Sequence, residues 1–213
     1  LDPLGLYSST VHEQITRGGL TSSGLSEACI KTIVKANIDQ DSGALTNSGP
    51  FSNPLNHGDN DQVAQTIQFQ YNNWLAALRT ECPADCKCDK IHNLLKEFGK
   101  VMHAMQDLYS HTNYVELHGG MTVSGLPGAM NVGVVPIWDM VGDNGVPNVP
   151  AGVVSGGFVW PGVGVPQPSP SHTEMNHDTP SSATGGLINA AGISNFTLSV
   201  NVATRATSAA WDN

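Results

Sequence analysis

The sequence predicts a mainly α-helical fold, and two observations carry this prediction. Apolar residues recur at helical spacing in several long segments. The stretches between these segments are rich in Gly, Pro, Asn and Ser, which favour turns and loops. Because the chain has 213 residues and is 39% hydrophobic, it can bury a sizeable core. We therefore expect one helical domain over residues 1–213.

The N-terminal part is expected to contain one helix followed by a long loop. Residues 9–36 show helical periodicity, with an interruption expected near Gly18 and Gly19. Residues 39–59 read "DQDSGALTNSGPFSNPLNHGD", a composition typical of a loop.

Three further helices are expected along the chain. Residues 61–79 and 89–116 each carry an apolar stripe on one side. Residues 182–210 regain helical character, although the glycines in this stretch weaken the pattern.

The segment of about residues 119–171 differs from the rest. It is rich in Gly, Pro and Val, holds only Asp139 and Asp143 as charges, and contains Trp138 and Trp160. We expect a long loop or a short β-hairpin insertion here. The segment either buries core or forms an apolar lip around a site, where its tryptophans could rest against lipid.

The charge pattern disfavours a protein that binds duplex nucleic acid. The formal net charge is −9, and the nine Lys and Arg residues are scattered instead of forming a basic stripe. No apolar stretch reaches the roughly 18 residues that a membrane span needs.

The cysteines favour a protein outside the cytosol. Cys82, Cys86 and Cys88 lie in "CPADCKC", and with Cys29 they favour two disulfides over a zinc knuckle. The sequon at Asn195 is compatible with secretion. No signal peptide is visible, so export would place Leu1 after a removed one. We expect a secreted, extracellular protein.

The histidines give the strongest functional signal. His103, Asp107 and His111 follow one another at steps of four in a helix that otherwise reads as core, so they share one side of it. Burying such groups without partners would cost several kcal/mol. The remaining histidines that lie near acids are His12, His57, His172 and His177. Imidazole and carboxylate together favour a multi-metal site, with zinc as the preferred ion.

Five motifs in order carry a family resemblance: "HEQIT", "IVKANIDQD", "NHGD", "GKVMHAMQDLYSHTNYVEL" and "SHTEMNHDTPSS". Together they resemble the fungal heterokaryon-incompatibility Het-C proteins and their bacterial relatives. Those proteins belong with the zinc-dependent phospholipases C and the trinuclear zinc nucleases. The resemblance implies a helical bundle of the zinc-dependent phospholipase C type, with the segment 119–171 as an insertion.

The resemblance also implies a ligand set for one to three zinc ions. A first ion would take Asp41 or Asp39, His57, His103 and Asp107. A second would take the terminal Leu1, His12 and the bridging Asp107. A third would take His111, His172 and an acid, for which Glu174 and Asp178 are candidates alongside His177, since Asn176 occupies the usual place.

These residues predict a secreted metal-dependent phosphodiester hydrolase, with phospholipase C action on phospholipid head groups favoured. Asp107 would orient the attacking water, and Asp41 or Asp59 would be the base. One alternative is a single-strand nuclease on the same metals, which would need exposed aromatic and cationic side chains. Another is a non-enzymatic, metal-stabilised toxin or incompatibility protein that acts on membranes.

Overall fold

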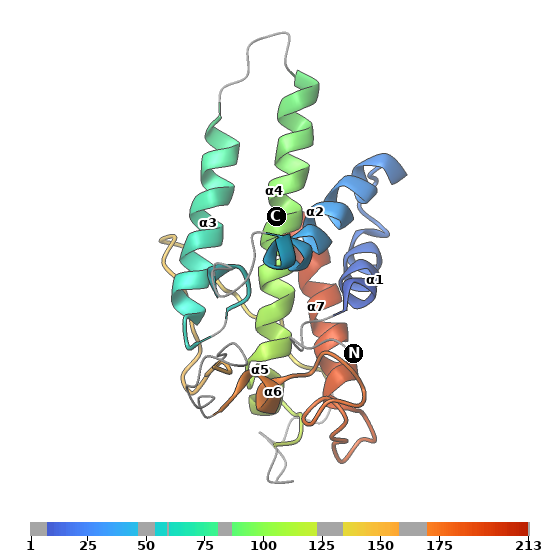
Figure 1. Ribbon diagram of the computed structural model, residues 1–213, viewed down its shortest axis with the longest axis vertical. Coiled ribbons are helices and arrows are strands. Elements are labelled where there is room, and N and C mark those ends of the chain that lie inside the picture. The colour runs from blue at the N-terminus through green and yellow to red at the C-terminus, as the bar shows by residue number, and fades with distance from the viewer. Residues whose placement is uncertain are drawn as a thin grey trace.

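Helices make up the regular structure of the described residues in the computed structural model (Figure 1). The structure describes residues 8–46, 54–58, 60–80, 87–122, 134–157 and 170–212, without the side chains of 42–46, 54, 87–89 and 173. Within these ranges no β-strand forms, and the mainly α-helical class is confirmed. The elements are α1 (Ser9–Leu20), α2 (Glu27–Thr46), the 3-10 helix η1 (Pro54–Asn56), α3 (Val63–Arg79), α4 (Lys87–His111), α5 (Tyr114–Leu117), α6 (His172–Met175) and α7 (Asn195–Asp212).

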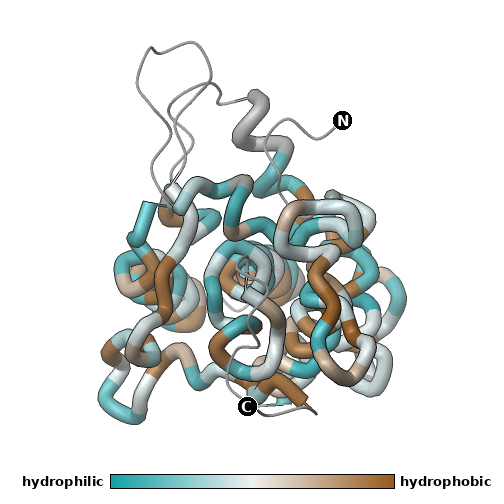
Figure 2. Tube along the Cα trace, turned by 90° about the horizontal axis from the view of Figure 1, so that it is seen from below, coloured by the Kyte–Doolittle hydropathy of each residue, from teal (hydrophilic) through white to brown (hydrophobic). Residues whose placement is uncertain are grey.

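The long helix α4 is the centre of the bundle. It packs against α2, α3 and α7, while α1 packs against α2 and α7. Figure 2 looks along the bundle and shows the helices grouped around a central one, with apolar and polar residues alternating around each turn. One side of α4 therefore faces α1 and α2, and another faces α3.

The first helix ends later than the sequence suggested, and the reason is a close helix contact. Gly18 and Gly19 stay inside α1, and the break falls at residues 21–26. A Cβ at Gly19 would lie 2.6 Å from Cβ of Thr207 on α7. These glycines therefore allow α1 to approach α7, and they do not interrupt the helix.

Helix α2 runs further than expected. Residues 39–46 were predicted to be loop but are helical. Lys35 and Asp39 pair one turn apart, with Nζ 2.6 Å from Oδ2, and Gln40 Nε2 donates to the carbonyl of Ala36. These local contacts stabilise helical structure beyond residue 39, where the turn-forming composition begins.

The predicted helix 61–79 is confirmed as α3, whereas the helix predicted over 89–116 divides at Thr112. The Thr112 hydroxyl donates to the carbonyl of Leu108 at 2.6 Å, and the backbone N–H of Asn113 donates to Val154. The loop that contains Val154 thus provides a hydrogen-bond partner in place of the next helical one. As a result, α4 and α5 are separate helices.

The last helix starts later than residue 182. Residues 182–194 form turns, and α7 begins at Asn195. The hydroxyls of Ser182 and Thr184 both donate to the carbonyl of Asn176, so this stretch folds back on the segment after α6. Such side-chain bonds to backbone compete with a helix.

Most of the described part of the insertion lies in residues 134–157, which are loop with isolated bridges of Val141 with Pro147, Ser155 with Thr112 and Gly157 with Ser171. Trp138 is 5% exposed, stacks on Tyr114 with ring centroids 5.0 Å apart, and donates through Nε1 to the carbonyl of Asn148. The expectation that this tryptophan meets lipid is therefore wrong, because the ring is part of the core. Trp160 lies outside the described residues.

Two features bear on the expected export. Cys29 is a free thiol within the described part of the chain, while Cys82, Cys86 and the side chain of Cys88 lie outside it, so the disulfides stay a prediction. The Asn195 side chain is buried and bonds both the N–H and the carbonyl of Met121. A glycan at this sequon would break both bonds. None of the described helices is long and apolar enough to cross a membrane.

Candidate metal centre

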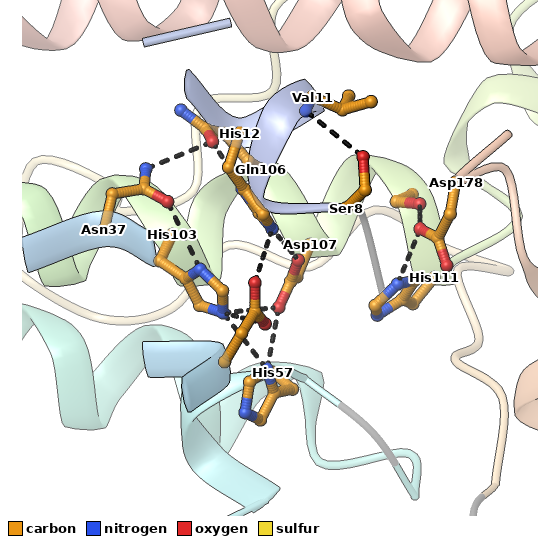
Figure 3. Close-up of polar contacts among 12 residues, drawn as sticks. Ser8, Val11, His12, Asn37, His57, His103, Gln106, Asp107, His111 and Asp178 are labelled. Carbon is orange, nitrogen blue, oxygen red and sulfur yellow. Dashed lines mark hydrogen bonds and ion pairs between the residues drawn. The ribbon is translucent and has the colours of Figure 1, made fainter. Parts of the chain in front are cut away.

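Helix α4 places three potential ligands on one side. His103, Asp107 and His111 lie one turn apart, and all three are fully buried. Neighbours on α4 such as Met102 and Leu108 face the hydrophobic core, which fixes the rotation of the helix. Figure 3 shows the three polar side chains leaving the same face of α4 toward segments from elsewhere in the chain.

The first group forms around one oxygen of Asp107. Its Oδ2 lies 2.9 Å from Nδ1 of His57 and 3.1 Å from Nε2 of His103. The two imidazole nitrogens are themselves 3.1 Å apart. His57 reaches this point from the loop after η1 (Figure 3).

The second group forms around the other oxygen of Asp107. Nε2 of His12, on α1, lies 3.3 Å from Asp107 Oδ1 and 3.9 Å from Asp41 Oδ2. Asp41, on α2, also lies 3.5 Å from Nε2 of His103 through Oδ1. Asp107 and His103 therefore connect the two groups, and five residues from four segments share one pocket.

The third group lies one turn further along α4. Nε2 of His111 is 3.0 Å from Asp178 Oδ1, and the rings of His111 and His172 meet edge to face at 4.3 Å. Ser110 donates its hydroxyl to the same Asp178 oxygen. His111, His172 and Asp178 are each no more than 2% exposed.

A buried amide network supports the first two groups, and the sequence gave no prediction of it. Nδ1 of His12 donates to Gln106 Oε1 at 2.7 Å, and Nδ1 of His103 lies 3.3 Å from Asn37 Oδ1. The amide nitrogens of Asn37 and Gln106 donate to the hydroxyl of Thr16 at 3.1 Å each. The available signal was weak: two uncharged amides inside otherwise apolar helical runs.

The network decides which nitrogen of each imidazole faces the pocket. An amide oxygen only accepts hydrogen bonds, so it holds the proton on Nδ1 of His12 and of His103. In the neutral form of each ring, Nε2 then carries the lone pair, directed at Asp107 and Asp41. Ligating histidines in metalloproteins are oriented by partners of this kind.

The carboxylates strongly perturb the pKa values of the second group. Burial alone would lower the pKa of His12, but the hydrogen bond and charge of Asp107, with the charge of Asp41, raise it to about 9. Burial also raises the pKa of Asp41 to about 7, against the lowering effect of His12. Both groups thus hold protons near neutrality that a cation would displace.

The pKa values of His103 and Asp107, the residues that connect the first two groups, are lowered. Burial lowers the pKa of His103 to about 3, so its ring is neutral. Burial favours the neutral form of Asp107, yet the interactions with the surrounding imidazoles of His103, His111 and His12, including hydrogen bonds, outweigh this and hold its pKa well below the usual range. A neutral imidazole beside an ionised carboxylate is the state that binds a metal.

Some predicted ligands lie elsewhere. Glu174, one of the candidates for the third group, is exposed and completes a capping box with Ser171 at the start of α6, whereas Asp178 is the acid that lies near His111 and His172. Asp39 is exposed and pairs with Lys35, which leaves Asp41 as the acid from α2. The expected ligand Leu1 and the expected base Asp59 lie outside the described residues.

His177 has a different role from the one considered for it. Its Nε2 lies 2.8 Å from Glu116 Oε1 in a buried pair, and its backbone N–H donates to Ser110. Burial lowers the pKa of His177, but Glu116 more than compensates and raises it. The pair fastens the chain next to Asp178 against α4 and α5, and so it positions the third group.

The donor sets fit a divalent transition metal. Within each of three groups the potential ligand atoms lie within 4.8 Å of one another: His12, Asp41 and His103; His57, His103 and Asp107; His111, His172 and Asp178. Both oxygens of Asp41 and Oδ2 of Asp178 are buried without a hydrogen-bond donor among the described residues. Buried carboxylate oxygens need such a partner, and imidazole with carboxylate suits zinc.

Fold and site together define a helical protein with a buried cluster of histidines and aspartates built on one central helix. The family model of the VWA7 N-terminal domain matches residues 8–128, more than half of the chain. The chain belongs to this family. The match includes α1 to α5, with His12, Asp41, His57, His103, Asp107 and His111, while His172 and Asp178 lie beyond it. No curated protein and no solved structure matches the chain.

Proposed function

We propose that this chain is a secreted, zinc-dependent phosphodiester hydrolase that acts on phospholipid head groups, built on a bundle of the zinc-dependent phospholipase C type. The observation that carries the proposal is the carboxylate of Asp107. It is fully buried, and both its oxygens face imidazoles from three separate segments, at 2.9–3.3 Å.

The residues present fit one to three zinc ions. His103, and His12 once zinc has displaced its second proton, each present Nε2 with its lone pair available, because the amide network holds the other proton on Nδ1. Bound zinc supplies Lewis-acid stabilisation of charge on a phosphoryl oxygen and activation of a water molecule for attack.

Asp41 is the residue best placed to move a proton. Its side chain is 17% exposed, whereas those of His12, His103 and Asp107 are fully buried, so it is the least buried of these four residues, although both its oxygens are buried. Its pKa, raised to about 7 by burial, allows it to accept a proton near neutral pH. Asp107, whose pKa is held low, keeps its charge and orients the histidines around it.

A second candidate function follows from the burial of the site. The ligands of the third group are no more than 2% exposed, and those of the first no more than 4%. A closed metal site with all positions filled by protein is typical of a structural role. In this reading the metals hold the bundle together and the chain acts through contact with a partner or a membrane.

Head-group release from liposomes tests the proposal. Phosphatidylcholine vesicles are incubated with zinc-loaded protein, with the chelated protein, and with the variants His103→Ala and His92→Ala. His92 is exposed on α4, away from the cluster, and controls for the substitution itself. Release of phosphorylated head group that stops with chelator and in His103→Ala, but persists in His92→Ala, supports hydrolysis. A zinc-loaded, folded protein that releases nothing overturns it, and zinc-dependent stability would then favour the structural role.

A further inference from the structure

An apolar cavity of about 450 Å³ lies beside α4, and none of the candidate metal ligands lines it. Its walls come from α3, α4, α7 and the segment 137–141. The side chains that line it are mostly aliphatic or aromatic, including Ile67, Trp74, Met102, Met105, Leu108 and Trp138. A volume of this size is in the range of pockets that bind small ligands.

The chemistry of the walls selects a flexible, uncharged chain. Met102, Met105 and Met140 line the cavity, and methionine adapts its shape to irregular apolar partners. Asp139 is the one ionisable acid or base among the described lining residues apart from Tyr71, and it is exposed at the edge. A negatively charged ligand would be repelled there, and a strongly polar one would find few hydrogen-bond partners.

The cavity also borders the candidate metal centre. Leu108 lines the cavity and packs on Gly58, where a Cβ would lie 2.5 Å from Leu108 Cδ2. Gln70, also in the wall, donates through Nε2 to the carbonyl of Leu55 at 3.2 Å. Two side chains of the cavity wall, Leu108 and Gln70, therefore contact the loop that carries His57.

We infer that this cavity binds a single acyl chain of an uncharged or zwitterionic lipid. The assignment of that lipid as the substrate rests on the proposed function, whereas the binding itself does not. The cavity would anchor the chain of a lipid whose head group is handled on the other side of the His57 loop.

Tryptophan quenching by a brominated lipid tests the binding directly. Trp74 and Trp138 line the cavity, so a monoacylglycerol with a dibrominated octadecanoyl chain should quench their fluorescence saturably, and the unbrominated lipid should compete. Ala209→Phe fills the cavity and should weaken binding at least tenfold. Ala64→Phe, on the exposed side of α3, should leave binding unchanged. Equal binding by the two variants, or quenching that does not saturate, overturns the inference.

A chain-length series decides the question even if Ala209→Phe fails to fold. For unmodified protein, affinity should rise about fourfold per added methylene, as burial of each CH₂ predicts, and then level off when the cavity is full. Affinity that is independent of chain length, or that rises without levelling off, overturns the inference. The assay contains no phosphodiester, so its failure leaves hydrolysis untouched, and failed hydrolysis leaves this binding intact.

Discussion

The amide oxygen of Gln106 lies 2.7 Å from Nδ1 of His12, so a side chain outside the ligand set determines which nitrogen of His12 faces Asp107. Asn37 stands in the same relation to His103. Of the three imidazoles that meet the carboxylates of Asp41 and Asp107 in this buried pocket, two are therefore oriented by side chains outside the ligand set.

Gln106→Leu is expected to lower zinc affinity by about 10- to 100-fold, the usual effect of losing a partner of a ligating histidine. The variant removes the acceptor that holds the proton on Nδ1 of His12. The measurement is competition with a chelating dye on protein whose helical circular dichroism is intact. Thr207→Val is the matched control, because it removes a hydroxyl that accepts from Gln106 and leaves the contact to His12 in place. Wild-type affinity in Gln106→Leu would show that the amide does not orient a ligand.

Zinc affinity is expected to rise with pH up to about pH 9. Below pH 7 both Asp41, with a pKa of about 7, and His12, with a pKa of about 9, hold protons that zinc must displace. The logarithm of the affinity should then rise by up to about two per pH unit below pH 7, by about one between pH 7 and 9, and not above. Titration calorimetry in buffers of different ionisation enthalpy counts the protons released, and a pH-independent affinity would contradict this assignment.

The stability of the metal-free protein, unlike its zinc affinity, should fall as the pH rises. The raised pKa of His12 stabilises the folded state fully below pH 6.5, and this contribution is lost as pH rises through about 9. The loss amounts to at most about 3 kcal/mol, since one pKa unit corresponds to 1.36 kcal/mol. Urea unfolding of chelated protein from pH 6.5 to 9 measures it, and saturating zinc should abolish the decline.

The central part of the site could be predicted from the sequence, because helical geometry alone places His103, Asp107 and His111 on one face. The start of α7 could not, since it depends on the hydroxyls of Ser182 and Thr184 reaching back to the carbonyl of Asn176. The end of α2 was predicted too early because the turn-forming composition after Asp39 outweighed the helical pair of Lys35 and Asp39. The choice of Asp178 over Glu174 likewise depends on how the chain turns after α6. The sequence shows two acids four residues apart, and the one available sign was the pattern Ser171-His-Thr-Glu174, which matches the S-x-x-E capping box.

The position of Asp178, rather than Glu174, next to His111 gives a direct test of the third group. Asp178→Asn should lose about one equivalent of zinc per chain, because a neutral amide ligates zinc poorly between two imidazoles. Glu174→Gln should keep its full zinc content, since the exposed side chain only accepts from the backbone of Ser171. Mass spectrometry of metal content after gel filtration makes the comparison. Equal zinc in both variants would remove His111, His172 and Asp178 as a metal site.

The close contact of α2 and α4 gives the last prediction, which links packing to the site. A Cβ at Gly99 would overlap the carbonyl oxygen of Ile33 and lie 2.9 Å from Cβ of Ala36. Alanine favours a helix over glycine by about 1 kcal/mol, but overpacking costs about 1–3 kcal/mol, so Gly99→Ala should be destabilised by up to about 2 kcal/mol.

The same substitution should weaken zinc binding, because separating α2 from α4 moves Asn37 and Asp41 away from His103. Gly142→Ala is the control: its Cβ would meet nothing closer than 3.5 Å, so stability and zinc affinity should both stay near wild type. Urea unfolding and dye competition measure the two quantities on the same samples. A Gly99→Ala protein as stable as wild type, with unchanged affinity, would mean that the two helices do not approach this closely.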